Sequence, residues 1–103
     1  MIIHFQLNYL TQWGEHIAVE IDGNANQPVA LSTEDGQHWE TTVKLSDRHA
    51  GELVTYRYSV WRGHQRVRQE RGAQRHIIHA ESQVEAAYFA NDNWRDLPQH
   101  NAL

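Results

Sequence analysis

Hydrophobic and polar residues alternate with a period of two along most of the chain. Over residues 3–9 the apolar side chains fall on one side and the polar ones on the other, and the pattern returns over 17–21, 39–45 and 54–60. Side chains of a β-strand point alternately to its two faces, so this alternation predicts half-buried strands. The residues expected to face the core are Ile3, Phe5, Leu7, Tyr9, Ile17, Val19, Ile21, Trp39, Thr41, Val43, Leu45, Val54, Tyr56, Tyr58 and Val60.

Short turn signals, each containing a glycine, separate these runs. They fall at 22–24, 34–36, 49–51, 62–63 and 71–72. The segment 82–91 has an alanine-containing centre that a helix would also accept, but Val84, Tyr88 and Phe89 favour a strand. Many short strands divided by turns predict an all-β fold, a small antiparallel β-sandwich.

Length and composition narrow the class of protein. The chain has 103 residues, which predicts one domain over 1–95, followed by a polar tail or the start of a linker over 96–103. It has no cysteine, which excludes disulfides and thiolate chemistry and suits a reducing compartment. The N-terminus lacks the charged and long apolar regions of a signal peptide, and no stretch approaches the ~20 apolar residues of a membrane helix. We therefore expect a cytoplasmic protein with no membrane partner.

Two of the four tryptophans leave the alternating pattern. Trp13 falls in the polar turn 11–15, where few core residues can reach it, so we expect water to cover much of its ring. An exposed indole suits a sugar, because the C–H face of a glucose ring stacks on an aromatic ring. The alternative is that Trp13 packs on Tyr9 or Leu10. Trp61 is out of phase with its strand, which makes it either a second sugar platform or a cap over a neighbouring strand.

Four stretches, taken in order, resemble the starch-binding domains of carbohydrate-binding module family 20. They are FQLNYLTQWGEHIAV, PVALSTEDGQHWETTVKL, VTYRYSVWRGHQRVRQERGAQR and YFANDNWRDLP. The set is most similar to the N-terminal modules of bacterial and plant 4-α-glucanotransferases. The resemblance implies an immunoglobulin-like sandwich with Trp94 packed in it. It also implies non-catalytic binding of α-1,4-glucan (starch, glycogen or maltooligosaccharide) beside the catalytic domain of the same enzyme.

The family's first sugar site uses two Trp platforms with a Lys, a Glu and an Asn. The positions that match the Lys, one Trp, the Glu and the Asn are, in that order, Arg57, Gln69, Glu70 and Gln74. The other Trp has no counterpart in the loop 22–27. The second site uses a turn aromatic, which Trp13 supplies, and a Tyr that the loop 33–37 lacks. The expected carbohydrate-binding residues are therefore Trp13, Arg57, Trp61, Gln69, Glu70 and Gln74, with Trp13 as the main anchor.

The missing stacking rings leave a second interpretation open, in which the chain is a structural or docking domain. Such a domain has lost sugar binding and packs on its catalytic domain or on a partner protein, with Trp61 and an arginine-rich hairpin as the interface. The arginines concerned are Arg57, Arg62, Arg66, Arg68, Arg71 and Arg75. A basic strip beside a Trp also suits nucleic acid. The net charge of −4 and the shortness of the strip argue against that partner.

Catalytic and metal sites lack the residue patterns that they need. His76 and His79 would point to opposite faces of a strand, and no His/Cys cluster has ligand spacing. Glycoside hydrolysis requires two carboxylates about 5–9.5 Å apart across a cleft, whereas the acids here scatter over loops and outer strand faces. We expect no catalytic residue, no cofactor and no metal.

Overall fold

The computed structural model describes residues 1–23, 27–45, 52–70, 76–79 and 87–94. Nine strands lie in these residues. The described part contains no helix, and therefore no helix that is long and apolar enough to cross a membrane. The strands are β1 (Ile2–Asn8), β2 (His16–Ile21), β3 (Val29–Ala30), β4 (Ser32–Thr33), β5 (His38–Lys44), β6 (Leu53–Arg62), β7 (Gln65–Gln69), β8 (His76–His79) and β9 (Ala87–Asn93).

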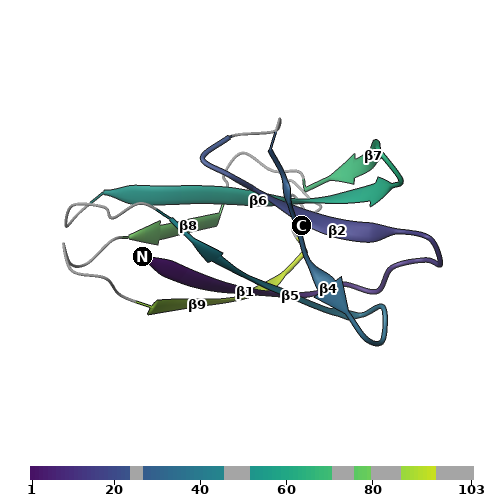
Figure 1. Cartoon of the computed structure of the whole chain (residues 1–103), viewed down its shortest axis with the longest axis horizontal. Helices are drawn as coiled ribbons and strands as arrows, with labels where there is room; N and C mark the ends of the chain where they lie inside the picture. The colour runs from purple at the N-terminus through teal and green to yellow at the C-terminus, as the bar shows by residue number, and fades with distance from the viewer. Residues whose placement is uncertain (24–26, 46–51, 71–75, 80–86, 95–103) are drawn as a thin grey trace, which may run out of the picture.

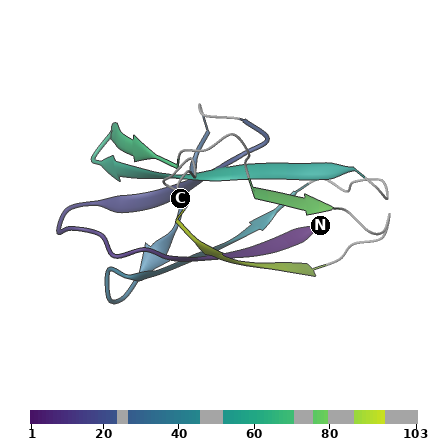
Figure 2. The same cartoon turned by 180° about the vertical axis from the view of Figure 1, so that it is seen from behind.

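Two sheets face each other as the layers of a β-sandwich (Figure 1). One sheet has the order β4-β5-β1-β9; the other has the order β3-β2-β6-β7, and β8 also pairs with β6. Seen from behind, the long strand β6 runs along one layer while β1 and β9 lie in the other (Figure 2). The expected all-β sandwich is confirmed. One pair departs from the antiparallel order, because β1 and β9 run parallel.

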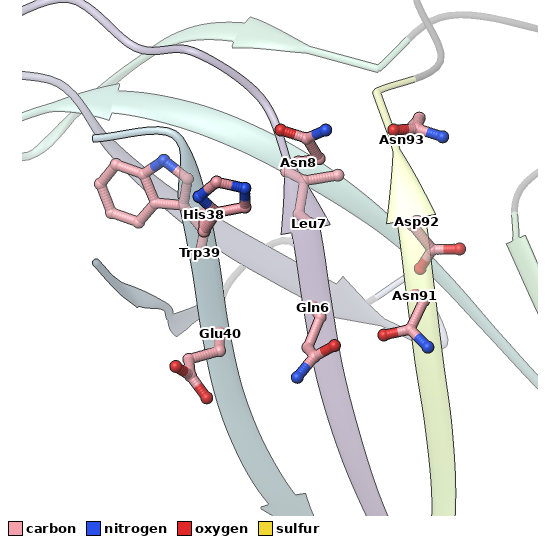
Figure 3. Close-up of a pocket in the computed structure, with 9 residues that line it drawn as sticks. All are labelled: Gln6, Leu7, Asn8, His38, Trp39, Glu40, Asn91, Asp92 and Asn93. Carbon is pink, nitrogen blue, oxygen red and sulfur yellow. The ribbon is translucent and has the colours of Figure 1, made fainter. Parts of the chain in front are cut away.

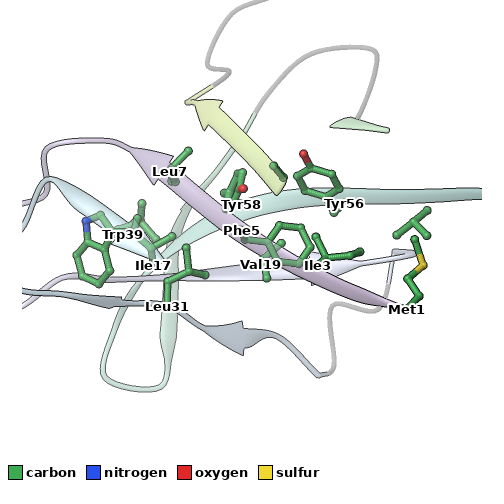
Figure 4. Close-up of a cluster of buried hydrophobic side chains, with 13 residues drawn as sticks. Met1, Ile3, Phe5, Leu7, Ile17, Val19, Leu31, Trp39, Tyr56 and Tyr58 are labelled. Atoms are coloured by element: carbon green, nitrogen blue, oxygen red, sulfur yellow. The ribbon is translucent and has the colours of Figure 1, made fainter. Parts of the chain in front are cut away.

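Most of the core between the sheets is built from residues that the alternation predicts (Figure 4). Met1, Leu31 and Ala90 also belong to it, and the predicted Thr41 does not. Phe5 of one sheet meets Tyr56 and Tyr58 of the other edge-on, with ring centroids 4.9 and 6.4 Å apart. Trp39 is 4 % exposed, which confirms its expected place in the core. Each large apolar side chain buried in this way stabilises the fold by about 1.5–3 kcal/mol, so the two sheets are joined chiefly by β1, β2, β5 and β6.

A buried polar network also joins the two sheets. Glu70 Oε1 accepts the Tyr58 N–H at 2.9 Å, and His76 Nε2 contacts both Glu70 oxygens at 3.0 and 2.9 Å. On its other side His76 Nδ1 lies 3.4 Å from Asp92 Oδ1, while Asp92 Oδ2 accepts the hydroxyls of Tyr56 and Tyr58, each at 2.7 Å. Burial, followed by the nearby Asp92 charge, raises the pKa of Tyr58 far above its usual range. His76 thus bridges carboxylates from both layers.

The C-terminal part of the chain agrees with the sequence analysis where the structure describes it. Trp94 is partly buried against the core and stacks on Tyr9, with ring centroids 4.5 Å apart. Strand β9 confirms the second half of the strand expected over 82–91. Residues 82–86, the predicted tail 96–103 and the domain end at residue 95 lie outside the described residues.

Candidate functional site

Trp13 lies at the tip of the turn between β1 and β2, and 98 % of its surface is exposed. The turn is closed by a hydrogen bond in which the Glu15 N–H donates to the Gln12 carbonyl at 3.0 Å. The exposure expected from the sequence is therefore confirmed. A ring this exposed does not pack on Tyr9 or Leu10, so the alternative interpretation of Trp13 is wrong.

Glu15 anchors the turn from inside and is only 8 % exposed. Its Oε1 accepts the Gln12 N–H at 2.7 Å, and its Oε2 accepts a hydrogen bond from the Arg68 guanidinium at 2.9 Å. Burial by itself would raise the pKa of Glu15. The Gln12 N–H, with Arg68 and Arg62, outweighs burial and holds that pKa below its usual value. Glu15 is thus a fixed negative charge at the base of the Trp13 turn.

Arg62, at the end of β6, forms hydrogen bonds to the same turn from the neighbouring hairpin. Its Nη1 donates to the Trp13 carbonyl at 3.4 Å, its Nη2 donates to Gln12 Oε1 at 3.2 Å, and Nη2 lies 3.8 Å from Glu15 Oε2. A Cβ on Gly14 would come 3.3 Å from Arg62 Nη1. Gly14 also has a φ of 90°, which favours glycine. The turn therefore has both the backbone freedom and the space that this contact needs.

Residues 33–36, from the end of β4 into the loop before β5, form the wall opposite Trp13. Thr11 ties the two turns together, because its N–H and its Oγ1 both donate to the Gly36 carbonyl, at 2.9 and 2.8 Å. Between the two turns lies an open hollow of about 570 Å³, lined by residues 11–15 and 33–36 and by Trp39. Its volume falls in the range of small-ligand sites, about 300–1,000 Å³. We call it the Trp13 hollow.

Asp35 fixes the shape of this wall. Its Oδ1 accepts the N–H groups of Gln37 and His38 at 2.9 and 2.8 Å, and its Oδ2 lies 2.7 Å from His38 Nδ1. These hydrogen bonds, led by the backbone and side chain of His38, hold the pKa of Asp35 well below its usual range. Asp35 carries a negative charge at neutral pH and uses it to order its own loop.

Three of the other expected sugar contacts lie together on the outer face of the second sheet, away from the Trp13 hollow. Trp61 is partly buried and its indole N–H donates to Ser59 Oγ at 2.8 Å. Gln69 Nε2 donates to Glu20 Oε1 at 2.9 Å. Arg57 is half-buried and lies opposite Glu20 in the β2–β6 register. Of these side chains, Trp61 and Gln69 already satisfy a polar atom within the protein.

Glu70 does not join that group. It is 4 % exposed, and its carboxylate is held by Tyr58 and His76 inside the sandwich. The expectation that Glu70 contacts a sugar therefore does not fit its position, because a buried and bridged carboxylate presents no oxygen to a ligand on the surface. Gln74 lies outside the described residues.

The arginine-rich hairpin is largely neutralised by acids from the first half of the chain. Arg62 and Arg68 face Glu15 at 3.8 and 2.9 Å, and Arg66 pairs with Glu20 at 3.0 Å. Arg71 and Arg75 lie outside the described residues. Arg62, Arg66 and Arg68 thus form ion pairs with acids of β2 and of the turn before it. This is the arrangement of a solvated hairpin face rather than of a phosphate-binding strip.

Comparison with known proteins identifies the fold but no family. No known family of sequences matches the chain, and no curated protein is similar to it in sequence. A glycoside hydrolase family 15 glucoamylase from Hypocrea jecorina superposes with a TM-score of 0.69 at 20 % identity, over 91 % of this chain and 17 % of that one. The glucoamylase from Hormoconis resinae gives 0.69 and 24 %, over 93 % and 17 %. The chain shares the fold of a small part of each.

Sequence analysis missed the residues that hold the Trp13 turn. Glu15, Arg62 and Arg68 each lie next to a glycine or in an arginine-rich run, which gives no sign of their partners. The one local signal is Gly14, because a glycine directly after the Trp in this polar turn indicates a constrained backbone. Among the described residues, no group of three His, Cys, Asp or Glu side chains is placed to hold a metal ion.

Proposed function

We propose that this chain is a non-catalytic carbohydrate-binding module that takes α-glucan in the Trp13 hollow. The observation that carries the proposal is the indole of Trp13, fully exposed yet held on a braced turn beside an open hollow. Large aromatic rings are normally sheltered from water, and an exposed ring on an ordered turn is suited to stacking on a sugar. The fold shared with two glucoamylases and the resemblance to starch-binding domains support the same ligand class.

Two of the three carboxylates that line the hollow, Glu15 and Asp35, favour binding over hydrolysis. Glu15 is engaged by the Gln12 N–H and by Arg68, and Asp35 is engaged by its own loop. A hydrolytic pair needs one carboxyl group that keeps its proton at neutral pH, whereas the pKa of both these groups is lowered. Polar groups around the hollow are then suited to hydrogen bonds with sugar hydroxyls, at a net gain of about 0.5–1.5 kcal/mol each.

The finer proposal is that the module belongs to a cytoplasmic 4-α-glucanotransferase. Binding of glucan to the module would raise the local substrate concentration at a catalytic domain in the same polypeptide, an effect of tethering that requires no new contact. The support is the ordered resemblance of four stretches of the chain and the absence of cysteine.

The proposal is tested by titrating the chain with β-cyclodextrin and maltoheptaose while recording backbone amide and indole N–H shifts by NMR. We expect shifts centred on Trp13 and on the loop 33–36. Trp13→Ala should lower affinity at least tenfold, since it removes the only ring in the described part of the chain that stands free beside this hollow. Leu10→Ala is the matched control, because Leu10 is exposed near the turn but does not line the hollow. Undiminished binding by Trp13→Ala would refute the site.

A docking domain is the second candidate, and the engaged side chains on the other sheet favour it. Gln69, Trp61 and Glu70, all expected to meet sugar, already bond within the protein. Under this proposal the module packs on its catalytic domain or a partner through the face that holds Trp61. Iodide quenching discriminates the two: protection of Trp13 fluorescence by maltodextrin supports sugar binding, and quenching that ignores maltodextrin supports docking.

A further inference from the structure

The outer face of the β5-β1-β9 sheet carries two rows of polar side chains that cross all three strands (Figure 3). In one row Gln6 of β1 lies opposite Glu40 of β5 and Asn91 of β9. In the next row Asn8 is flanked by His38 and Asn93 in the same way. The two rows line a hollow of about 340 Å³, distinct from the Trp13 hollow, and Trp39 borders both.

Most of these polar groups have no partner within the described part of the chain. Asn8 Oδ1 accepts a hydrogen bond from Gln37 at 3.3 Å, and His38 is paired with Asp35. The other four side chains are exposed and make no hydrogen bond or ion pair with a described residue; they belong to Gln6, Glu40, Asn91 and Asn93. The face therefore presents amide donors and acceptors that only water satisfies.

An exposed aromatic ring stands at the end of these rows. Phe89 is 70 % exposed and lies opposite His4, the β1 residue two positions before Gln6. The two rings are stacked, with centroids 4.7 Å apart and planes 15° apart, and His4 Nδ1 lies 2.9 Å from Thr42 Oγ1. Phe89 is thus a flat apolar platform whose orientation is fixed from the side of β1.

The amino-acid types on this face are unusual for strands. Asn and Asp are depleted in β-strands, yet β9 ends in Asn91-Asp92-Asn93. Asp92 points inward and has a structural reason, because it accepts the two tyrosine hydroxyls. Asn91 and Asn93 have no such role. Residues that have low strand propensity, yet lie in a strand without a structural role, are expected at functional sites.

The chemistry of the face selects its ligand. An amide group offers a donor and an acceptor side by side, as a sugar hydroxyl does. None of the residues lining the hollow is Lys or Arg, and Glu40 adds a negative charge, so a phosphate or another anion would be repelled. One exposed Phe is too small an apolar area for a protein interface. A neutral polyhydroxyl ligand fits all three conditions.

We propose that this face is a second carbohydrate-binding surface, which binds a neutral oligosaccharide. Phe89 stacks on one sugar ring, and the side chains of the two polar rows form hydrogen bonds with the neighbouring sugars. The surface does not include Trp13 and goes beyond the function proposed for the Trp13 hollow. Each can therefore fail without the other.

The experiment uses the Trp13→Ala chain, so that the first hollow cannot contribute. Side-chain NH₂ signals of Asn and Gln are followed by NMR during separate titrations with maltoheptaose and cellohexaose to millimolar concentration. We expect saturable shifts in the side-chain amides of Gln6, Asn8, Asn91 and Asn93 with at least one sugar. Phe89→Ala should then weaken binding at least about fivefold, by loss of aromatic stacking.

Gln65→Ala is the matched control, because Gln65 is an exposed glutamine of β7 on the other sheet. It should leave the titration unchanged. The proposal is overturned if neither sugar moves the four amides, or if the shifts persist unchanged in both Phe89→Ala and Gln6→Ala. If the parent chain shows shifts at Trp13 alone, sugar binding in the Trp13 hollow is supported and binding on this face is refuted. If it shows shifts on this face alone, binding on this face is supported and binding in the Trp13 hollow is refuted.

Discussion

At the scale of single residues, the exposed ring of Trp13 depends on side chains that do not touch the ring itself. The Glu15 carboxylate and the Arg62 guanidinium bind the backbone and the neighbouring side chain of its turn. A turn that is ordered before binding loses less conformational entropy when a ligand arrives. These residues are therefore positioning residues, whose substitution should change sugar affinity without removing a sugar contact.

Arg62→Met should weaken maltoheptaose binding by about three- to tenfold, because ordering a side chain or turn on binding costs about 0.5–1.5 kcal/mol. The substitution keeps the aliphatic stem and removes the donors to Trp13 and Gln12. Isothermal titration calorimetry measures the change. Arg66→Met is the matched control, since Arg66 pairs with Glu20 and not with the turn. Equal losses in the two variants would contradict a role for Arg62 in holding Trp13.

Acid should destabilise the protein partly through Glu15. Its pKa is lowered on folding from the ordinary value of 4.5, so its charge stabilises the folded state above that pH, and this stabilisation is lost as pH falls through the lowered value. Asp35 acts in the same direction, from an ordinary value of 3.8. The urea midpoint should hold from neutral pH to about 5 and fall below it. In Glu15→Gln the fall should be shallower; a steeper fall would contradict this assignment.

At the scale of elements, the buried network ties β6, β8 and β9 together through Asp92 and His76. Asp92 is the shared acceptor for two tyrosine hydroxyls, and His76 connects it to Glu70. Interior polar groups of this kind stabilise only while every partner is present, because an unsatisfied group keeps its full desolvation cost. The pairing of β8 with β6 therefore depends on a residue in the other sheet.

Asp92→Ala should lower the free energy of unfolding by at least about 2 kcal/mol, because it removes an acceptor from two buried hydroxyls and each unsatisfied group costs about 1–3 kcal/mol. Asp92→Asn retains one acceptor oxygen and should cost less. Urea denaturation followed by tryptophan fluorescence measures both. Equal stability of the alanine and asparagine variants would show that the hydroxyls do not need this acceptor.

Sequence alternation predicted the core faces of β1, β2, β5 and β6, because each is long enough to show a period of two. It could not predict β3 and β4, which have two residues each. The expectation that Glu70 contacts a sugar came from the resemblance to starch-binding domains, and a local sequence pattern could not show that this carboxylate is buried. Its partners come from other strands, and such contacts leave no mark in the local sequence. The same reason hid Arg62, whose partners in the Trp13 turn lie 49 and 50 residues away.

At the scale of the whole molecule, opposite charges are interleaved rather than separated. Arg62, Arg66 and Arg68 of the β6–β7 hairpin are paired with Glu15 and Glu20 from β2 and its preceding turn, and the chain as a whole carries a net charge of −4. Phosphate backbones bind to unpaired cations by releasing counterions, and paired arginines have little to offer them. This charge distribution is consistent with the neutral ligand proposed above.

We accordingly expect no binding to generic single-stranded oligonucleotides at low salt, where electrostatic association is strongest. Fluorescence anisotropy of a labelled oligonucleotide checks this at micromolar protein concentration. Glu15→Gln and Glu20→Gln together would release Arg62, Arg66 and Arg68, and this double variant serves as the positive comparison. Salt-sensitive binding by the parent chain would contradict the neutral-ligand assignment.

The parallel pairing of β1 with β9 has a mechanical consequence. Ile2 lies beside Ala87 at one end of the pair and Asn8 lies beside Asn93 at the other, so the two strands start together and finish together. A force pulling residue 1 away from residue 94 would slide these strands along each other and load all the hydrogen bonds between them at once. An antiparallel pair pulled from one end would open bond by bond. The sandwich should therefore resist stretching between these two points.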